Sequence, residues 1–176
     1  MAEEDGVVES HRLIVTGNNN SGKSVVVEEA HATVTGPGNF DFWQTEAGHS
    51  PHDLSIGRSP MKFFPAPGGT MFRLFTIPPA DPKLTPAEIA AMQEWFFNEI
   101  GSPEARGDTS RHPMMHTTPT VDYIVLLSGE ISLVLDEGNA IELKPFDAIV
   151  QRATHHSWIN TGREPALLMC VMVGGK

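Results

Sequence analysis

One stretch of this 176-residue chain decides its fold: HTTPTVDYIVLLSGE, residues 116–130. Residues 120–127 are rich in the β-branched and aromatic side chains that favour strands, and Ser128-Gly129 is typical of a following turn. Alternate residues of a strand share a face, so a strand through this stretch would carry four polar side chains on one side. These are His116, Thr118, Thr120 and Asp122. An imidazole, two hydroxyls and a carboxylate on one face predict a site on the inner side of a sheet.

Short β-patterned runs on both sides of this stretch predict an all-β fold. Turn signals rich in Gly, Pro, Asn and Asp separate the runs, as at residues 127–130, 136–139 and 144–147. Several short strands at this spacing are typical of a sandwich or barrel. The predicted strands cover residues 12–16, 24–28, 70–77, 120–127, 131–135, 140–143, 148–152 and 166–173.

One helix, over about residues 86–100, is predicted to interrupt the strands. Thr85 and Glu88 have the spacing of a capping box, and Pro86 suits the first helical position. Gly101 followed by Pro103 predicts the end of the helix. An apolar stripe at helical spacing should pack on the outside of the sheet, with a functional lid as the alternative. The stripe consists of Ile89, Met92, Phe96 and Ile100.

A second polar segment, QRATHHSWIN at residues 151–160, contains two adjacent histidines. Neighbouring strand residues point to opposite faces, so we expect His156 to face inward and His155 to lie at the surface. Trp158 and Asn160 share the face of His156. Trp158 is therefore either an aromatic wall for an organic ligand or a barrel-packing residue.

Convergence of His116, Asp122 and His156 inside a barrel would give a two-histidine, one-carboxylate site. Such a site suits one divalent transition metal (Fe, Mn, Ni or Zn) and leaves coordination positions open for substrate. His112 is a further candidate ligand if Pro113 bends the chain, because four extended residues span about 13 Å. The alternative for His112 is an exposed position at the start of a strand.

Residues 116–130 resemble the first motif of the cupin superfamily, commonly written G-x₅-H-x-H-x₃₋₄-E-x₆-G. Residues 144–160 resemble the second, G-x₅-P-x-G-x₂-H-x₃-N. The resemblance implies a small jelly-roll β-barrel with a metal at its centre. His116, Asp122 and His156 match ligand positions of these motifs, with Asp122 in place of the usual Glu. Thr118 replaces the second histidine of the first motif, which leaves one ligand position without a ligand-type side chain.

Candidate substrate-binding residues are Thr118, Thr120, Trp158 and Arg73, while no catalytic residue is predicted. Arg73 lies inside the apolar run of residues 70–77. A charged residue there is either an outward, solvated side chain or an inward clamp for a substrate carboxylate or oxyanion.

Residues 17–24, GNNNSGKS, fit the phosphate-binding pattern G-x-x-x-x-G-K-[ST]. The pattern binds phosphate only where a helix follows it, because the helix N-terminus faces the anion. Here Val25-Val26-Val27 follows, and consecutive β-branched residues favour a strand. We therefore predict a hairpin turn and no nucleotide.

Composition limits the partners and the location of the chain. A net charge of −10 and a sequence pI near 5.1 argue against a nucleic-acid partner. The polar N-terminus does not resemble a signal peptide, and no apolar run is long enough to span a bilayer. A cytoplasmic protein with a buried Cys170 and no membrane partner is expected. The apolar final strand and the open sheet edge predict a homodimer.

Residues 1–176 are predicted to form a single domain. It would comprise N-terminal strands (about 12–77), a helical insertion (about 82–111) and motif-bearing barrel strands (about 112–173). The predicted function is a cupin-type enzyme, leaning to metal dependence, for an oxygenated organic metabolite. Lyase (decarboxylase or dehydratase) or isomerase chemistry is favoured, and a dioxygenase is the less favoured reaction. The alternative, supported by Thr118, is a metal-free cupin that binds a small ligand without catalysis.

Overall fold

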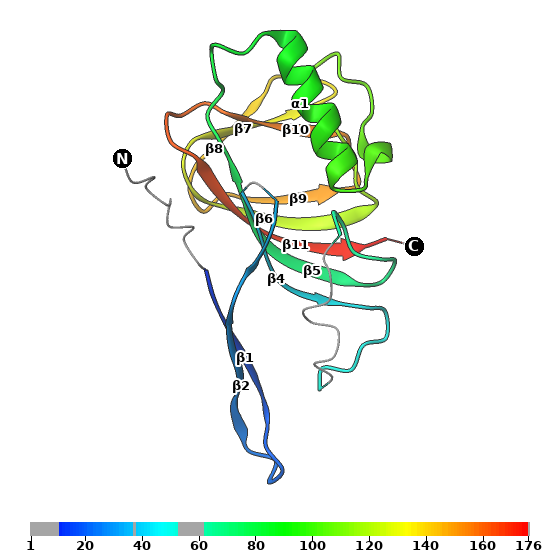
Figure 1. Ribbon diagram of the computed structural model, residues 1–176, viewed down its shortest axis with the longest axis vertical. Coiled ribbons are helices and arrows are strands. Elements are labelled where there is room, and N and C mark those ends of the chain that lie inside the picture. The colour runs from blue at the N-terminus through cyan, green and yellow to red at the C-terminus, as the bar shows by residue number, and fades with distance from the viewer. Residues whose placement is uncertain (1–10, 37, 53–61, 176) are drawn as a thin grey trace, which may run out of the picture.

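The computed structural model describes residues 11–36, 38–52 and 62–175, and the structural statements below concern these residues. They form strands joined by short turns, with one α-helix and one 3₁₀ helix (Figure 1). The elements are β1 (Arg12–Asn18), β2 (Ser24–His31), β3 (Thr33–Gly36), β4 (Asn39–Thr45), β5 (Thr70–Ile77), α1 (Pro86–Glu99), η1 (Pro103–Ala105), β6 (Thr120–Ser128), β7 (Ile131–Leu135), β8 (Ile141–Leu143), β9 (Ala148–Arg152), β10 (His156–Asn160) and β11 (Ala166–Gly174).

Two antiparallel sheets face each other and enclose the core. The larger has the order β3-β4-β5-β11-β6-β9, and the smaller has the order β10-β7-β8. Figure 1 shows the smaller sheet as a layer above the larger one. The core cluster between them includes Met71, Ile124, Leu126 and Leu168, with Trp158 packed against it. This all-β jelly-roll barrel with one inserted helix confirms the predicted fold class.

The central strands β6 and β11 alternate as the sequence predicts. On β6 the side chains of Thr120, Asp122, Ile124 and Leu126 are buried, while Tyr123 between them is exposed. A strand covered on one face and paired on both edges has one favourable register, since a one-residue slip would expose the whole apolar set. Cys170 of β11 is buried as expected, and this burial raises the pKa of its thiol.

Strands β1 and β2 form a ribbon that projects from the barrel (Figure 1). Its turn is closed by the Asn19 side chain, which accepts hydrogen bonds from the backbone N–H groups of Ser21 and Lys23. Gly22 has a φ of 72°, a conformation that glycine adopts without steric cost. Residues 17–24 therefore form the predicted hairpin, with a strand where a phosphate-binding loop would need a helix.

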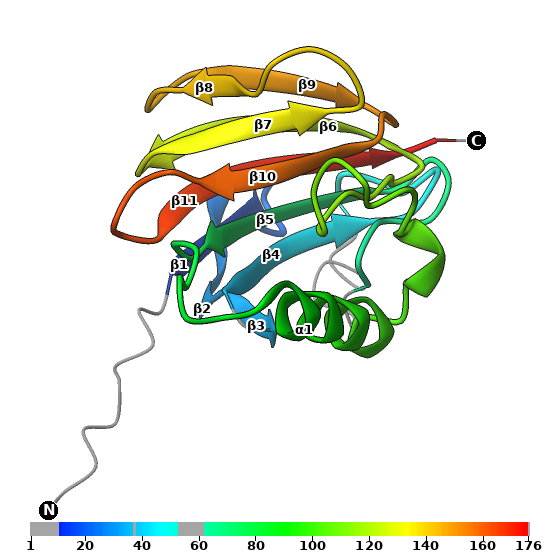
Figure 2. The ribbon, with the colours of Figure 1, turned by 90° about the horizontal axis from the view of Figure 1, so that it is seen from above.

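Helix α1 begins with the predicted capping box. The Glu88 N–H donates to the Thr85 hydroxyl, and the Thr85 N–H donates to the Glu88 carboxylate. The predicted apolar stripe is partly wrong, because Met92 is 56% exposed. The buried positions are instead Gln93 and Phe97, which lie one turn apart on the same face. Figure 2 shows α1 on the side of β3 and β4, away from β8 and β9.

Among the residues placed by the structure, no helix is both long and apolar enough to cross a membrane.

Candidate functional site

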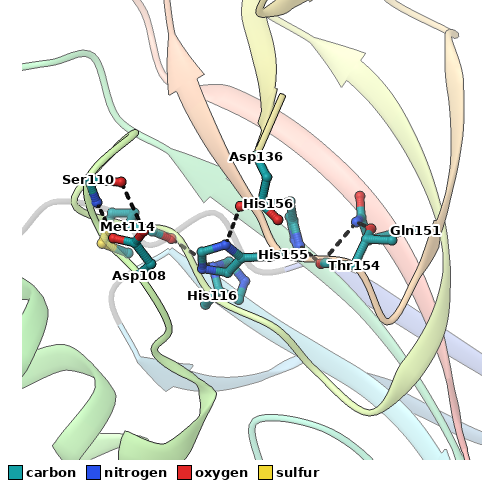
Figure 3. Close-up of polar contacts among 9 residues, drawn as sticks. All are labelled: Asp108, Ser110, Met114, His116, Asp136, Gln151, Thr154, His155 and His156. Carbon is teal, nitrogen blue, oxygen red and sulfur yellow. Dashed lines mark hydrogen bonds and ion pairs between the residues drawn. The ribbon is translucent and has the colours of Figure 1, made fainter. Parts of the chain in front are cut away.

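His116 and His156 form the centre of the candidate site. The two residues pair through their backbones, with N–H to O distances of 2.9 Å and 3.0 Å in the two directions. Directly opposed residues of an antiparallel pair project to the same side. The two imidazole rings accordingly lie together, with centroids 4.4 Å apart and planes inclined by 48°. Figure 3 shows these rings beside that of His155.

A backbone carbonyl fixes the orientation of each ring. Nδ1 of His116 lies 2.8 Å from the Met114 carbonyl oxygen, and Nδ1 of His156 lies 2.9 Å from that of Thr154. A carbonyl oxygen only accepts, so each neutral ring must carry its proton on Nδ1. Nε2 of each ring is therefore left as a lone pair, able to accept a proton or to bind a metal.

Both histidines are held neutral by their surroundings. Burial lowers the pKa of His116, and burial together with the neighbouring His116 lowers the pKa of His156 to about 3. A second positive charge beside the first would be unfavourable, which adds to the cost of desolvation. The pair therefore offers two unprotonated Nε2 atoms at neutral pH.

Aromatic side chains from three parts of the chain surround the pair. The rings of Phe63 and Phe97 lie 5.9 Å and 5.6 Å from the ring of His116. Trp158 meets His156 edge-on at 5.7 Å, beside the histidine as the sequence predicts. The sequence analysis missed Phe63 and Phe97. The buried face of α1 could have indicated Phe97, but no local pattern marks Phe63.

A chain of hydroxyls leads to Asp122 inside the barrel. Thr120 donates to Thr118 at 2.7 Å, and Thr118 donates to Asp122 Oδ2 at 3.4 Å. Oδ1 of Asp122 is buried and has no hydrogen-bond partner among the residues that the structure describes, and burial raises the pKa of this carboxyl group. Oε1 of Gln93 is also buried without a partner. Both oxygens lack the donor that buried polar atoms ordinarily have.

The structure brings His116 and His156 together, but it does not bring Asp122 to them. Within residues 11–36, 38–52 and 62–175, no three His, Cys, Asp or Glu side chains lie close enough to hold one metal ion. Thr118, Thr120 and Asp122 are buried in alternation as expected, whereas His116 lies before β6 and pairs with His156. The predicted three-ligand centre is thus not formed by these residues, which supply two imidazole donors.

Arg73 is neither solvated nor free to clamp a substrate. Its side chain is buried, and it donates from Nε and Nη2 to the carboxylate of Asp41 at 2.7 Å and 3.1 Å. It also donates to the backbone carbonyls of Lys62 and Phe63. The prediction of an outward, solvated Arg73 is therefore wrong. Arg73 points inward, but Asp41 occupies the hydrogen-bond donors that would bind a substrate carboxylate. Asp41, on the unpredicted strand β4, was missed.

His155 and His112 both have partners of their own. His155 was expected at the surface, yet its side chain is 15% exposed and its Nδ1 donates to Asp136 at 2.6 Å (Figure 3). Nδ1 of His112 accepts from the Met114 N–H and from the Ser157 hydroxyl. Neither histidine adds a third ligand to the pair.

Comparison with known proteins identifies the domain that contains this site. Residues 104–172 match the cupin domain family. Phomopsin biosynthesis cluster protein D of Diaporthe leptostromiformis is 53% identical over 47 residues, which are 27% of this chain and 25% of that protein. A cupin-domain-containing oxidoreductase of Aspergillus ruber is 37% identical over 62 residues, which are 34% of this chain and 30% of that protein. The matches therefore span a quarter to under a third of these relatives' own length.

Several solved structures align with most of the chain at low sequence identity. The cupin domain of Cnp3 from Schizosaccharomyces pombe covers 93% of this chain and 88% of its own, with 8% identity and a TM-score of 0.41.

Proposed function

We propose that this chain, whose residues 104–172 match the cupin domain family, is a small-molecule enzyme that works at His116 and His156. The substrate is an oxygenated organic metabolite. The reaction is a proton transfer next to a carbonyl group, as in lyase or isomerase chemistry. The observation that carries this proposal is the pair of unprotonated Nε2 atoms in a buried, aromatic setting.

The paired imidazoles suit the removal of a proton from carbon. One Nε2 accepts the proton, and the negative charge that develops on the substrate stabilises the imidazolium formed. This charge opposes the effect of burial, which otherwise keeps the pKa of His156 low. Phe63, Phe97 and Trp158 exclude water and pack against the carbon skeleton.

The unpaired oxygens of Asp122 and Gln93 explain why an oxygenated ligand is favoured. Each is a buried acceptor that lacks a donor among the described residues. A substrate hydroxyl supplies such a donor and removes the cost of an unsatisfied buried oxygen. In this proposal Thr118 and Thr120 hold the Asp122 carboxylate rather than contact the substrate directly.

Hydrogen–deuterium exchange tests proton transfer without knowledge of the full reaction. Pyruvate, 2-oxobutyrate and dihydroxyacetone are incubated with the protein in D₂O, and loss of the C–H signal next to the carbonyl is followed by NMR. We expect exchange that falls at least tenfold in His156→Ala and in His116→Ala, and that is unchanged in Tyr123→Phe, an exposed control. Exchange that survives in both histidine variants would contradict the assignment. Binding without exchange would identify a metal-free binding protein instead.

A second candidate places one divalent transition metal (Fe, Mn, Ni or Zn) at the two Nε2 atoms. The Nδ1 bonds favour it, because metal-ligating histidines almost always donate their other ring N–H to an oxygen acceptor. The described residues supply only two protein ligands. Metal content of freshly purified protein decides between the candidates: stoichiometric metal that His156→Ala removes supports the second. Iron in that site would favour the dioxygenase reaction.

A further inference from the structure

A pocket of about 270 Å³ lies between the C-terminal half of α1 and the segment that follows η1. Its lining includes the polar side chains of Glu94, Asn98, Arg106 and Thr109. The ring of Phe97 lines the same pocket and lies 5.6 Å from the ring of His116. Phe97 therefore stands between the pocket and the histidine pair.

Backbone pairing places Arg106 on the histidine side of this segment. Arg106 is the bridge partner of His116, which in turn is the bridge partner of His156. Opposed residues of antiparallel pairs start toward the same side, so the Cβ of Arg106 leaves the backbone on the side of the two histidines, and the side chain lines the pocket. The Thr117 N–H donates to the Ala105 carbonyl at 2.8 Å and fixes this register.

The guanidinium of Arg106 has no carboxylate partner in the described part of the chain, although it is partly buried. Arg73 differs in this respect, because Asp41 and two carbonyls occupy its donors. A guanidinium group is planar and permanently charged, so it can donate two parallel hydrogen bonds to one carboxylate. Asn98 and Thr109 add neutral donors at the same pocket.

We infer that this pocket binds the carboxylate of a small organic acid through Arg106. The volume of about 270 Å³ is just below the roughly 300–1,000 Å³ of typical ligand pockets, which suits a small monocarboxylic acid rather than a nucleotide. The carbon skeleton packs against Phe97, whose ring also contacts His116. The inference that a carboxylate binds here is drawn from the pocket alone. That the bound acid is also the substrate rests on the proposed function.

Matched acids and amides test the carboxylate class directly. The affinities of butyrate, benzoate and cinnamate are measured by NMR titration beside those of their primary amides, which have nearly the same shape but no charge. We expect the wild-type protein to prefer at least one acid over its amide. Arg106→Ala should weaken binding of that acid about ten- to a hundredfold, as for a lost charge-assisted hydrogen bond, and change amide binding less than twofold. Arg106→Lys should restore part of the loss.

Glu94 lines the same pocket and carries a negative charge, so replacing it should change acid binding in the opposite direction to Arg106→Ala. Glu94→Gln removes a negative charge and should tighten acid binding about two- to threefold. An acid preference absent from the wild-type protein, or kept in Arg106→Ala, would overturn the inference.

His156→Ala separates this inference from the proposed function. If His156→Ala keeps the acid preference but loses proton exchange, both stand. The preference for acid over amide could depend on Arg106 while neither the wild-type protein nor any variant shows proton exchange. In that case the proposed reaction is wrong and the carboxylate site remains.

Discussion

The carboxylate of Asp41 and the guanidinium of Arg73 meet inside the barrel through two hydrogen bonds, although 32 residues separate them in the chain. They are register partners on β4 and β5. Arg73 also reaches the backbone at residues 62 and 63, so the pair connects one strand to the segment that carries Phe63.

Asp41→Asn should destabilise the protein by about 3–5 kcal/mol, because it leaves the buried Arg73 charge without its counter-ion. Urea denaturation followed by fluorescence measures the change. The double variant with Arg73→Met should recover much of the loss, since no uncompensated charge then remains. A single variant as stable as the wild type would show that the pair is not formed.

Loss of the helix cap gives a smaller and pH-dependent effect. Thr85→Ala should cost about 1 kcal/mol at neutral pH, the usual cost of losing a Thr N-cap. The Thr85 backbone N–H and, to a smaller extent, the Thr85 hydroxyl lower the pKa of Glu88. Thr85→Ala removes only the contribution of the hydroxyl, which is present above the ordinary pKa of this group and is lost as pH falls through the lowered value. The difference between variant and wild type should therefore shrink in acid. A difference that grows as pH falls would contradict the capping box.

Asp122 should make the protein less stable as pH rises. Because burial raises its pKa, the folded state holds the proton more tightly than the unfolded state. Its contribution to stability is complete below the ordinary value of 3.8 and is lost as pH rises through the folded pKa. Asp122→Asn cannot ionise, so this variant should gain stability relative to the wild type as pH rises above 3.8. Parallel denaturation curves across that range provide the measurement.

His155 and His156 should fail in different ways when replaced by Ala. His156→Ala removes half of the paired site and should abolish proton exchange with the fold largely retained. His155→Ala removes the hydrogen bond to Asp136, so it should lower the melting temperature while exchange continues. Asp136→Asn is the matched control for His155→Ala. If proton exchange were lost in His155→Ala but kept in His156→Ala, the reactive histidine would be His155 and not His156.

A row of apolar side chains across the outer face of the larger sheet supports the predicted dimer. Tyr123 and Val150 are register partners, 53% and 56% exposed, and Val171 and Phe72 continue the row across β11 and β5. We expect a dimer by light scattering across a concentration series, and a shift to monomer in Tyr123→Glu. A monomeric wild-type protein at all concentrations would refute the prediction.

The sequence predicted the barrel well where a strand is buried on one face and paired on both edges. Thr120 to Leu126 alternates cleanly because β6 lies between β11 and β9. Alternation holds from Thr118 to Leu126, and Pro119 precedes the start of β6. His116 is placed instead by its backbone pairing with His156, 40 residues later, which no local pattern reveals.

Long-range partners account for the other differences. Arg73 could be assigned to neither face, because its counter-ion lies on β4, a strand whose mixture of Asn, Asp and aromatic residues gives no clear pattern. His155 was expected at the surface by alternation alone, which cannot reveal Asp136. The helix was predicted from its cap, yet its buried face includes a polar residue, Gln93, that no apolar stripe would contain.

The carbonyls that orient His116 and His156 belong to residues only two positions earlier in the chain. A carbonyl within its own tripeptide therefore orients each ring, while the backbone pairing of His116 with His156 brings the two rings together. Phe63, Phe97 and Trp158, by contrast, come from three separate segments and could be exchanged one at a time. A library that varies these three aromatic positions and spares residues 114–116 and 154–156 would explore new ligands while keeping the reactive nitrogens in place.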